Sequence, residues 1–169
     1  MSVTFAKAVV DAGPLFTMLT LVFARKHDRE AILGRAHIPR DPEIQAAYWR
    51  LFDDVGTLLT TSHVVGELQG LQNSRLGLKG MDLEHFWLSG IDFLIEKNFD
   101  ERLIGLLAMH AEERSRQRIC IFGPADAGVT ELALREKCVL FTDDGTLRDF
   151  ARRNGVRCEL VQELVRGAL

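Results

Sequence analysis

The stretch Ala8-Val9-Val10-Asp11-Ala12-Gly13-Pro14-Leu15 decides the fold that the sequence predicts. It begins with a short apolar run typical of a buried strand, and Asp11 directly follows that run. Pro14 then opens an apolar segment that continues from Leu15 to Arg25. Proline is well tolerated at a helix start because its missing N–H would have no partner there. The stretch therefore predicts a buried strand and a buried helix, joined by a turn that carries an acid.

The rest of the chain repeats this alternation of short apolar runs and segments with helical spacing. Because strands separated by helices form parallel sheets with helices on both faces, we expect an α/β fold with a single domain over residues 1–169. Its architecture would be a three-layer α/β/α sandwich with a central parallel sheet. Further strands are predicted at Thr57–Thr61, Val139–Phe141 and Val156–Leu160. Helices are predicted at Asp41–Phe52, at Ser62–Leu71 with Ser62 as its cap, at Met81–Ile95, at Glu101–Arg116, from Pro124 with Val129, Leu132 and Ala133 facing inward, and from Gly145 to a stop at Gly155.

Composition limits the class of protein without defining its function. The 169 residues suit one domain, and a hydrophobic content of 47% is enough to fill its core. The net charge of -3 and the pI of about 6.0 argue against attachment to nucleic acid through bulk positive charge. They do not exclude a nuclease whose acidic metal site lies beside a local basic strip.

Cysteines and apolar segments bear on the cellular compartment. The three cysteines, Cys120, Cys138 and Cys158, form no CxxC pair, and their odd number argues against a disulfide framework. We interpret them as buried thiols of a cytoplasmic protein. The apolar segment Leu15–Ala24 has about ten residues and is too short for a membrane span, and the N-terminus lacks the pattern of a signal peptide. We therefore expect no membrane association.

Acids lie at the ends of two predicted strands. Asp11 follows the first strand, and Asp143 and Asp144 follow Val139–Phe141. In a parallel sheet the carboxyl ends of the strands open into the crevice where ligands bind. Each of these acids also has a purely structural explanation, because aspartate commonly caps a helix or occupies a turn.

Two further acids are predicted on helices. Glu67 shares a helical face with Val64 and Leu68, and an acid on an apolar stripe is costly to bury unless a cation or a metal ion pairs with it. The alternative is a glutamate at the edge of the stripe that reaches water. Asp126 lies in the first turn of a later predicted helix, where the helix dipole alone stabilises an acid.

Considered together, these acids predict a metal site. Asp11, Glu67, Asp126 and Asp144 all occupy positions that can face the same edge of one sheet. Mg²⁺ and Mn²⁺ prefer hard oxygen ligands in an octahedral arrangement, and carboxylates from separate elements supply such ligands. The five histidines are scattered, and none pairs with the acids at the spacing of a metal motif.

Four stretches contain these acids in order along the chain: Ala8–Leu15, Thr61–Leu68, Gly123–Ala127 and Leu140–Leu147. In sequence and in order they resemble the PIN-domain family of metal-dependent ribonucleases, which includes the VapC-type toxins. The resemblance covers most of the chain. It implies a PIN-like fold and a Mg²⁺- or Mn²⁺-dependent endoribonuclease that hydrolyses RNA and leaves a 5′-phosphate.

The resemblance also implies roles for individual residues. The metal ligands and catalytic acids would be Asp11, Glu67, Asp126 and Asp144. Thr142 matches a hydroxyl residue shortly before the family's last acid, and this spacing favours Asp144 over Asp143 as the ligand. Asp143 and Thr142 would then support the ligands without binding the ion. Ions held there would lower the pKa of a bound water, orient it and neutralise charge on the phosphate.

Two features depart from the family's pattern. Gly13 stands two places after Asp11, where the family often has a small polar residue. The region from about Lys26 to Arg50 is longer than in compact members of the family. This longer region is a candidate surface for a dimer or a partner.

RNA binding needs cations, and the candidates in the sequence are Arg114, Arg116 and Arg118. Their alternative role is a solvated helix end, where cations complement the helix dipole. The net charge of the chain makes such local arginines necessary for any contact with RNA.

Partner binding is a second hypothesis for the function. Many small members of the family are toxins that an antitoxin protein silences, so we consider an antitoxin partner and a homodimer. The helices between Asp41 and Ile95, with Trp49 and Trp87, are the candidate surface, although both tryptophans also suit the core. A catalytically weak PIN-like scaffold that acts through a protein partner is therefore the alternative function.

Two other classes of phosphate-handling protein have an acid after a strand. A haloacid-dehalogenase phosphatase needs a second aspartate two residues after the first, and Gly13 occupies that position. A response-regulator receiver needs an additional acid pair before its phosphorylated aspartate and a lysine after a later strand, and neither is evident. We therefore favour the metal-dependent nuclease.

Overall fold

The structure is a computed structural model that describes residues 5–104 and 123–168. Within this part of the chain, five strands form one parallel sheet in the order β3-β2-β1-β4-β5. This arrangement confirms the predicted α/β fold with a central parallel sheet. The strands are β1 (Phe5–Val10), β2 (Val55–Thr61), β3 (Asp100–Arg102), β4 (Val139–Thr142) and β5 (Cys158–Leu160).

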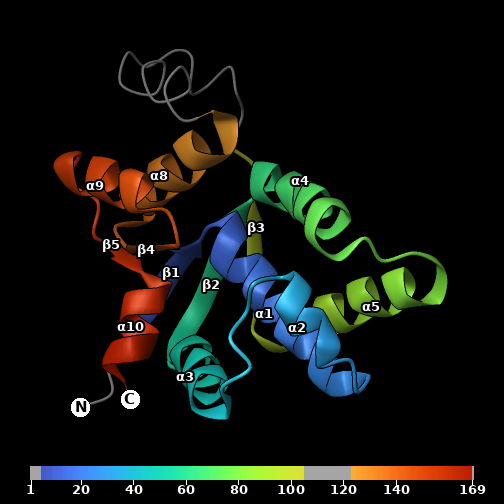
Figure 1. The fold of residues 1–169 in the computed structure, drawn as a ribbon. Coiled ribbons are helices and arrows are strands. Elements are labelled where there is room, and N and C mark those ends of the chain that lie inside the picture. Colours follow the sequence, from blue (N-terminus) through green and yellow to red (C-terminus); the bar gives the residue numbers. More distant parts are fainter. Residues whose placement is uncertain (1–4, 105–122, 169) are drawn as a thin grey trace.

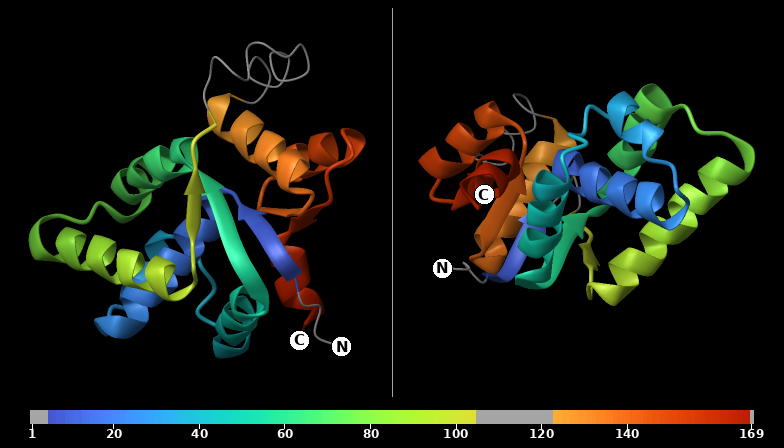
Figure 2. Two further views of the ribbon diagram at one scale, coloured as in Figure 1. Left: turned by 180° about the vertical axis from the view of Figure 1, so that it is seen from behind. Right: turned by 60° about the horizontal axis from the view of Figure 1, so that its bottom comes forward.

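Helices cover both faces of the sheet and complete three layers (Figure 1). The helix α1 lies on one face with α3 and α10, and α5 packs against α1, whereas α8 and α9 cover the opposite face, as Figure 2 shows. The helical elements are α1 (Ala12–Lys26), α2 (Ala31–Arg35), α3 (Pro42–Asp53), α4 (Ser62–Leu71), the π-helical turn η1 (Gln72–Leu76), α5 (Gly80–Glu96), α8 (Pro124–Glu136), α9 (Gly145–Arg153) and α10 (Val161–Gly167).

The central strand β1 explains why its sequence is a continuous apolar run. Its last three residues, Ala8, Val9 and Val10, are fully buried, because β1 pairs with β2 on one side and with β4 on the other while helices cover both faces. Strands that are buried on both faces read as unbroken hydrophobic runs rather than as alternating patterns. In the sheet, β2 and β3 lie on one side of β1, and β4 and β5 lie on the other. The carboxyl ends of β1 and β4, which the acids follow, are therefore neighbours.

The edge strand β3 corrects the sequence prediction. Glu101 and Arg102 were expected to begin a helix that continues to Arg116, but they pair with Thr60 and Thr61 of β2. The pattern misleads because β3 consists of three polar residues on a sheet edge, where charged side chains are common and no apolar run is needed. The rest of that predicted helix, residues 105–116, lies outside the described residues.

Other boundaries agree with the sequence or shift slightly. Ser62 is not a cap, because Thr61 occupies the cap position of α4 and makes no side-chain hydrogen bond there. The predicted strand Val156–Leu160 begins two residues later, at Cys158. The helix α10 and the short α2 were not predicted. Within the described residues, no helix is long and apolar enough to cross a membrane.

Both tryptophans and two of the three cysteines lie within the described residues. Trp49 and Trp87 are half-buried and pack against the core. Cys158 is buried and Cys138 half-buried, and both are free thiols, so the expectation of full burial is wrong for Cys138. Cys120 lies outside the described residues.

Candidate functional site

The acids gather at the carboxyl end of the sheet. From β1 the chain passes to β2 on one side, and from β4 it passes to β5 on the other side. Such a reversal of strand order leaves a crevice outside the carboxyl ends of the two central strands, where ligands bind in open α/β sheets. Asp11 ends β1 and Asp144 follows β4, and the first turns of α1, α4 and α8 converge at this end of the sheet (Figure 1).

A surface pocket of about 390 Å³ lies at this position, and we call it the acid pocket. Four of the residues that line it come from four different elements, and they are the acids that the sequence singled out: Asp11, Glu67, Asp126 and Asp144. Arg75 of η1 also lines it. The structure therefore brings together the four acids that are separated by up to 133 positions in the chain, from 11 to 144.

Asp11 has the most enclosed carboxylate of the four. Its side chain is 7% exposed, and its Oδ1 accepts a hydrogen bond of 2.7 Å from the backbone N–H of Ala12. Its Oδ2 accepts a second bond of 2.7 Å from the hydroxyl of Thr142. Burial raises the pKa of Asp11, the two hydrogen bonds lower it, and the nearby Asp144 raises it. Asp11 is thus a helix cap and a member of the acid pocket at the same time.

The hydroxyl of Thr142 joins the ends of the two central strands. Thr142 is fully buried, and its Oγ1 donates to Asp11 Oδ2 while accepting a bond of 3.0 Å from the backbone N–H of Asp144. One side chain therefore positions both the acid that ends β1 and the backbone that carries the acid after β4. This placement agrees with the supporting role predicted for Thr142.

Replacing Thr142 with valine should destabilise the chain by about 1–3 kcal/mol, because it leaves buried polar partners without their hydrogen bonds. Valine has nearly the same shape and lacks only the hydroxyl group. Thr142→Ser is the matched control, since it keeps the hydroxyl and loses one methyl group, which costs about 1 kcal/mol. Urea denaturation of the three proteins measures the difference. A valine variant as stable as the parent would contradict this role.

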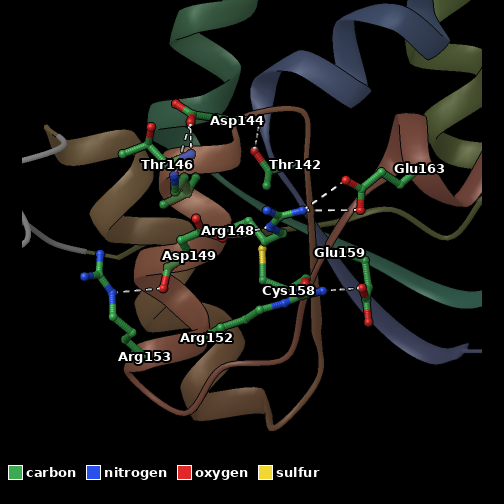
Figure 3. Close-up of polar contacts among 11 residues, drawn as sticks. Thr142, Asp144, Thr146, Arg148, Asp149, Arg152, Arg153, Cys158, Glu159 and Glu163 are labelled. Atoms are coloured by element: carbon green, nitrogen blue, oxygen red, sulfur yellow. Dashed lines mark hydrogen bonds and ion pairs between the residues drawn. The ribbon is translucent and has the colours of Figure 1, made fainter.

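Asp144 caps α9 and keeps one oxygen for other partners. Its Oδ1 accepts from the backbone N–H groups of Thr146 and Leu147, at 2.7 and 3.2 Å (Figure 3). Among the described residues no hydrogen bond uses Oδ2, and the side chain is exposed. The capping role that the sequence offered as an alternative is real, and it leaves Asp144 able to bind a cation.

Asp126 is a second acid of the pocket with a raised pKa. It lies in the first turn of α8 and is half-buried. Burial, followed by the charges of Asp11, Glu67 and Asp144, raises its pKa from 3.8 to about 7. These causes indicate that the four carboxylates are close enough to repel one another.

Glu67 belongs to the pocket for a different reason from the one predicted. The sequence placed it on an apolar stripe, where burial would be costly, but the side chain is exposed and only its neighbours Val64 and Leu68 are buried. Partial desolvation and the charge of Asp11 raise its pKa, and His63 lowers it. Glu67 therefore reaches the pocket from the edge of the stripe.

Asp143 does not line the acid pocket. It lines an adjoining pocket, and its Oδ2 lies 3.4 Å from the position that a Cβ atom on Gly13 would occupy. Burial and the charge of Asp11 raise its pKa to about 6, although Gln162 and Arg75 act in the opposite direction. Its Oδ1 is buried without a hydrogen-bond partner. Asp143 is thus beside the four acids and outside the pocket that they line.

Arg75 is the residue of the acid pocket that the sequence analysis missed. It lies eight residues after Glu67, which places both on one face of the continuous helical run through α4 and η1. That spacing was the available signal. The predicted RNA-binding residues Arg114, Arg116 and Arg118 lie outside the described residues. Two other basic residues near the site, Arg148 and Arg152 of α9, are paired with Glu163 and Glu159 (Figure 3).

The donor set of the acid pocket suits a hard divalent cation. Carboxylate oxygens are the ligands that Mg²⁺ and Mn²⁺ prefer. Four carboxylate groups line this pocket, and Arg75 is the single arginine among its lining residues. In the described part of the chain, no three acidic, histidine or cysteine side chains already stand at the spacing for one ion. Glu67 and Asp144 are exposed, and exposed side chains change rotamer within nanoseconds, so they can close around an ion.

Comparison of the chain with models of known protein families, with curated proteins and with solved structures finds no match. The fold and the acid pocket are therefore the observations from which a function has to be argued.

Proposed function

We propose that this chain is a Mg²⁺- or Mn²⁺-dependent ribonuclease of the PIN type. The observation that carries the proposal is the meeting of four carboxylates from four separate elements in one pocket, at the point where the strand order reverses. Purely structural acids have no reason to converge, because like charges in one pocket repel and raise one another's pKa. A bound cation removes that repulsion.

Each residue of the pocket has a role in this proposal. Asp11, Glu67, Asp126 and Asp144 would hold the metal, which when bound supplies an activated water and positive charge opposite the phosphate. The hydroxyl of Thr142 keeps the carboxylate of Asp11 directed into the pocket. The guanidinium of Arg75 is placed to contact a phosphate oxygen, for which its planar group of N–H donors is well suited.

The choice of RNA as the substrate comes from the resemblance of the four acid-bearing stretches to the PIN-domain family. A Cβ atom at Gly13, which departs from that family's pattern, would make ordinary van der Waals contact with Asp143, 3.4 Å from its Oδ2. The structure therefore gives no reason for glycine at this position. Location in the cytoplasm and control by an antitoxin belong to the same proposal, and the free thiols of Cys138 and Cys158 suit a reducing compartment.

A second candidate function, binding of a protein partner by a catalytically weak scaffold, is favoured by one surface. The helix α5 exposes apolar side chains at Met81, Leu88, Ile91 and Ile95, which are between 49% and 71% accessible. Exposed apolar residues that recur along one helix are typical of an interaction surface. A homodimer and a complex with an antitoxin both fit this surface.

A cleavage assay on mixed cellular RNA separates the two candidates. The parent chain is incubated with Mg²⁺, with Mn²⁺ and with EDTA, and 5′-phosphate ends are detected on the products. The ribonuclease proposal expects cleavage with metal and none with EDTA. Absence of cleavage by the folded chain under all three conditions would overturn it and leave the partner-binding scaffold.

A further inference from the structure

A second pocket adjoins the acid pocket, and we call it the side pocket. It has a volume of about 420 Å³, and Gly13 and Arg75 line both pockets. Its walls come from α1, the segment before α3, α3 itself, η1, the end of β4 and α10. If the acid pocket binds one group of a longer molecule, the next part of that molecule can therefore enter the side pocket.

The side pocket has the mixed walls that bind a flat heterocycle with polar edges. Ile38 and Val165 are buried and Ile44 is half-buried, and together they provide an aliphatic surface. Tyr48 and Gln162 add a phenol and an amide. The walls of the side pocket are therefore partly apolar and partly polar, and polar groups of this kind fix the orientation of a ligand in a binding site.

Two arginines give this pocket its positive charge. Arg75 lies where the two pockets meet, and its charge lowers the pKa of Asp143. Arg166 of α10 lies near Tyr48: burial raises the pKa of Tyr48, and the charge of Arg166 acts in the opposite direction. Both arginines are exposed, and neither forms an ion pair within the described residues. The guanidinium carbon of Arg75 lies over the ring of Phe16, 5.8 Å from its centroid. Guanidinium groups bind phosphate through paired N–H donors.

Asp143 provides an acceptor in the wall of the side pocket. Its Oδ1 is buried and lacks a hydrogen-bond partner, a situation that costs free energy in a folded protein. Rotation of the carboxylate toward the pocket would let an N–H donor of a bound ligand satisfy it. Nucleobases carry such donors on their edges, and proteins recognise unstacked RNA bases through those edges.

Part of the longer region between Lys26 and Arg50 forms a wall of the side pocket. Within it, residues 36–39 together with Ile44 and Tyr48 form one side of the pocket wall. The sequence analysis considered this region as a dimer or partner surface. Its contribution to the pocket instead connects it with the acid pocket through Gly13 and Arg75.

We propose that the side pocket binds the nucleoside next to the scissile phosphate of an RNA strand, with Arg75 and Arg166 contacting the phosphates on either side of that nucleoside. This inference rests on the proposed ribonuclease function, because it takes the acid pocket as the place where the phosphodiester is cut. It assigns the substrate a single-stranded form, since a paired base cannot enter a pocket without leaving its stack.

Binding of nucleotides to the metal-free protein tests the inference without relying on cleavage. Each of the four nucleoside 5′-monophosphates is titrated into the chain in EDTA and followed by calorimetry, with ribose 5-phosphate and inorganic phosphate as the probes that lack a base. We expect saturable binding of at least one nucleotide, about tenfold or more tighter than either probe, because base contacts contribute to it.

Variants locate that binding in the side pocket. Arg166→Gln should weaken it about tenfold or more, and Ile44→Trp should abolish it by filling the pocket, whereas Arg153→Gln on α9 removes an arginine elsewhere and should not change it. Thermal denaturation checks that each variant is folded. If no nucleotide binds, if inorganic phosphate binds as tightly, or if the first two variants bind like the parent, the inference is wrong.

The two proposals fail in distinguishable ways. A chain that cuts no RNA with any metal, yet binds a nucleotide that Arg166→Gln releases, supports the side pocket and overturns the ribonuclease. A chain that cuts RNA with metal but binds no nucleotide, and whose KM for RNA is unchanged by Ile44→Trp, supports the ribonuclease and overturns the side pocket.

Discussion

Asp11→Asn lowers the rate of metal-dependent RNA cleavage at least about 100-fold, since residues that only support a metal ligand already change activity by about 10–100-fold when mutated. The substitution removes one negative charge from the centre of the acid pocket and leaves a weak amide ligand in place of a carboxylate. Gel analysis of a defined RNA oligonucleotide in Mn²⁺ measures the two rates.

The asparagine that replaces Asp11 should preserve the fold, so that the lost activity reports on the site. Its amide oxygen can still accept the hydrogen bond from the N–H of Ala12, and its amide nitrogen can donate to the hydroxyl of Thr142. Because the buried carboxylate of Asp11 has a raised pKa, the neutral amide should also make the metal-free chain more stable near neutral pH.

Asp149→Asn is the matched control for this charge change. Asp149 is an exposed acid of α9 that does not line the acid pocket, so its substitution changes the net charge equally and leaves the pocket intact. Its variant should cut RNA at the rate of the parent. Equal rates for Asp11→Asn and the parent would remove Asp11 from the site, and equal losses in both variants would point to a general effect of charge.

Asp126→Asn raises the thermal stability of the metal-free chain at about pH 8 and leaves it nearly unchanged at about pH 3, below the ordinary pKa of the acid. The folded pKa of Asp126 is about 7, above the ordinary value of 3.8, so the folded state holds its proton more tightly than the unfolded state does. Its contribution to stability is therefore present in full below the ordinary pKa, decreases as the pH rises, and is lost once the pH passes about 7.

An asparagine mimics the protonated acid at every pH, which makes the difference between variant and parent the informative quantity. We expect the Tm difference to grow between about pH 4 and pH 7 and then to level off at about 3 °C or more, roughly 1 kcal/mol for a domain of this size. Scanning calorimetry in EDTA at several pH values measures it. A Tm difference that does not depend on pH would contradict the crowding of charge that we infer.

The acids at strand ends could be predicted because their position follows from topology alone. Asp11 and Asp144 come directly after or close behind apolar runs, and parallel strands bring their carboxyl ends to one edge of the sheet. Glu67 was placed in the site through an incorrect premise, since it is exposed and approaches the pocket from the side. Its exposure matches the alternative of a glutamate at the edge of the stripe, and helical spacing still indicated the direction in which it points.

Features that depend on tertiary packing could not be predicted. The strand β3 carries no apolar signal, because pairing with β2 at the sheet edge holds its polar residues in place. The side pocket combines residues from α1, α3, η1 and α10, and no local pattern connects them. In the sequence, Arg75 and Arg166 therefore cannot be distinguished from ordinary surface cations. The fold places both of them at the side pocket.

Binding of Mn²⁺ to the purified chain tests the central claim most directly, because the acid pocket either holds a divalent ion or does not. Isothermal titration at about pH 7.5, where the ion can displace protons from the acids of the pocket into the buffer, should show saturable binding in the parent. The double variant Asp11→Asn/Asp126→Asn should lose that binding, and Asp149→Asn should retain it. A parent chain that binds no Mn²⁺, or a double variant that binds it as tightly as the parent, would contradict the account.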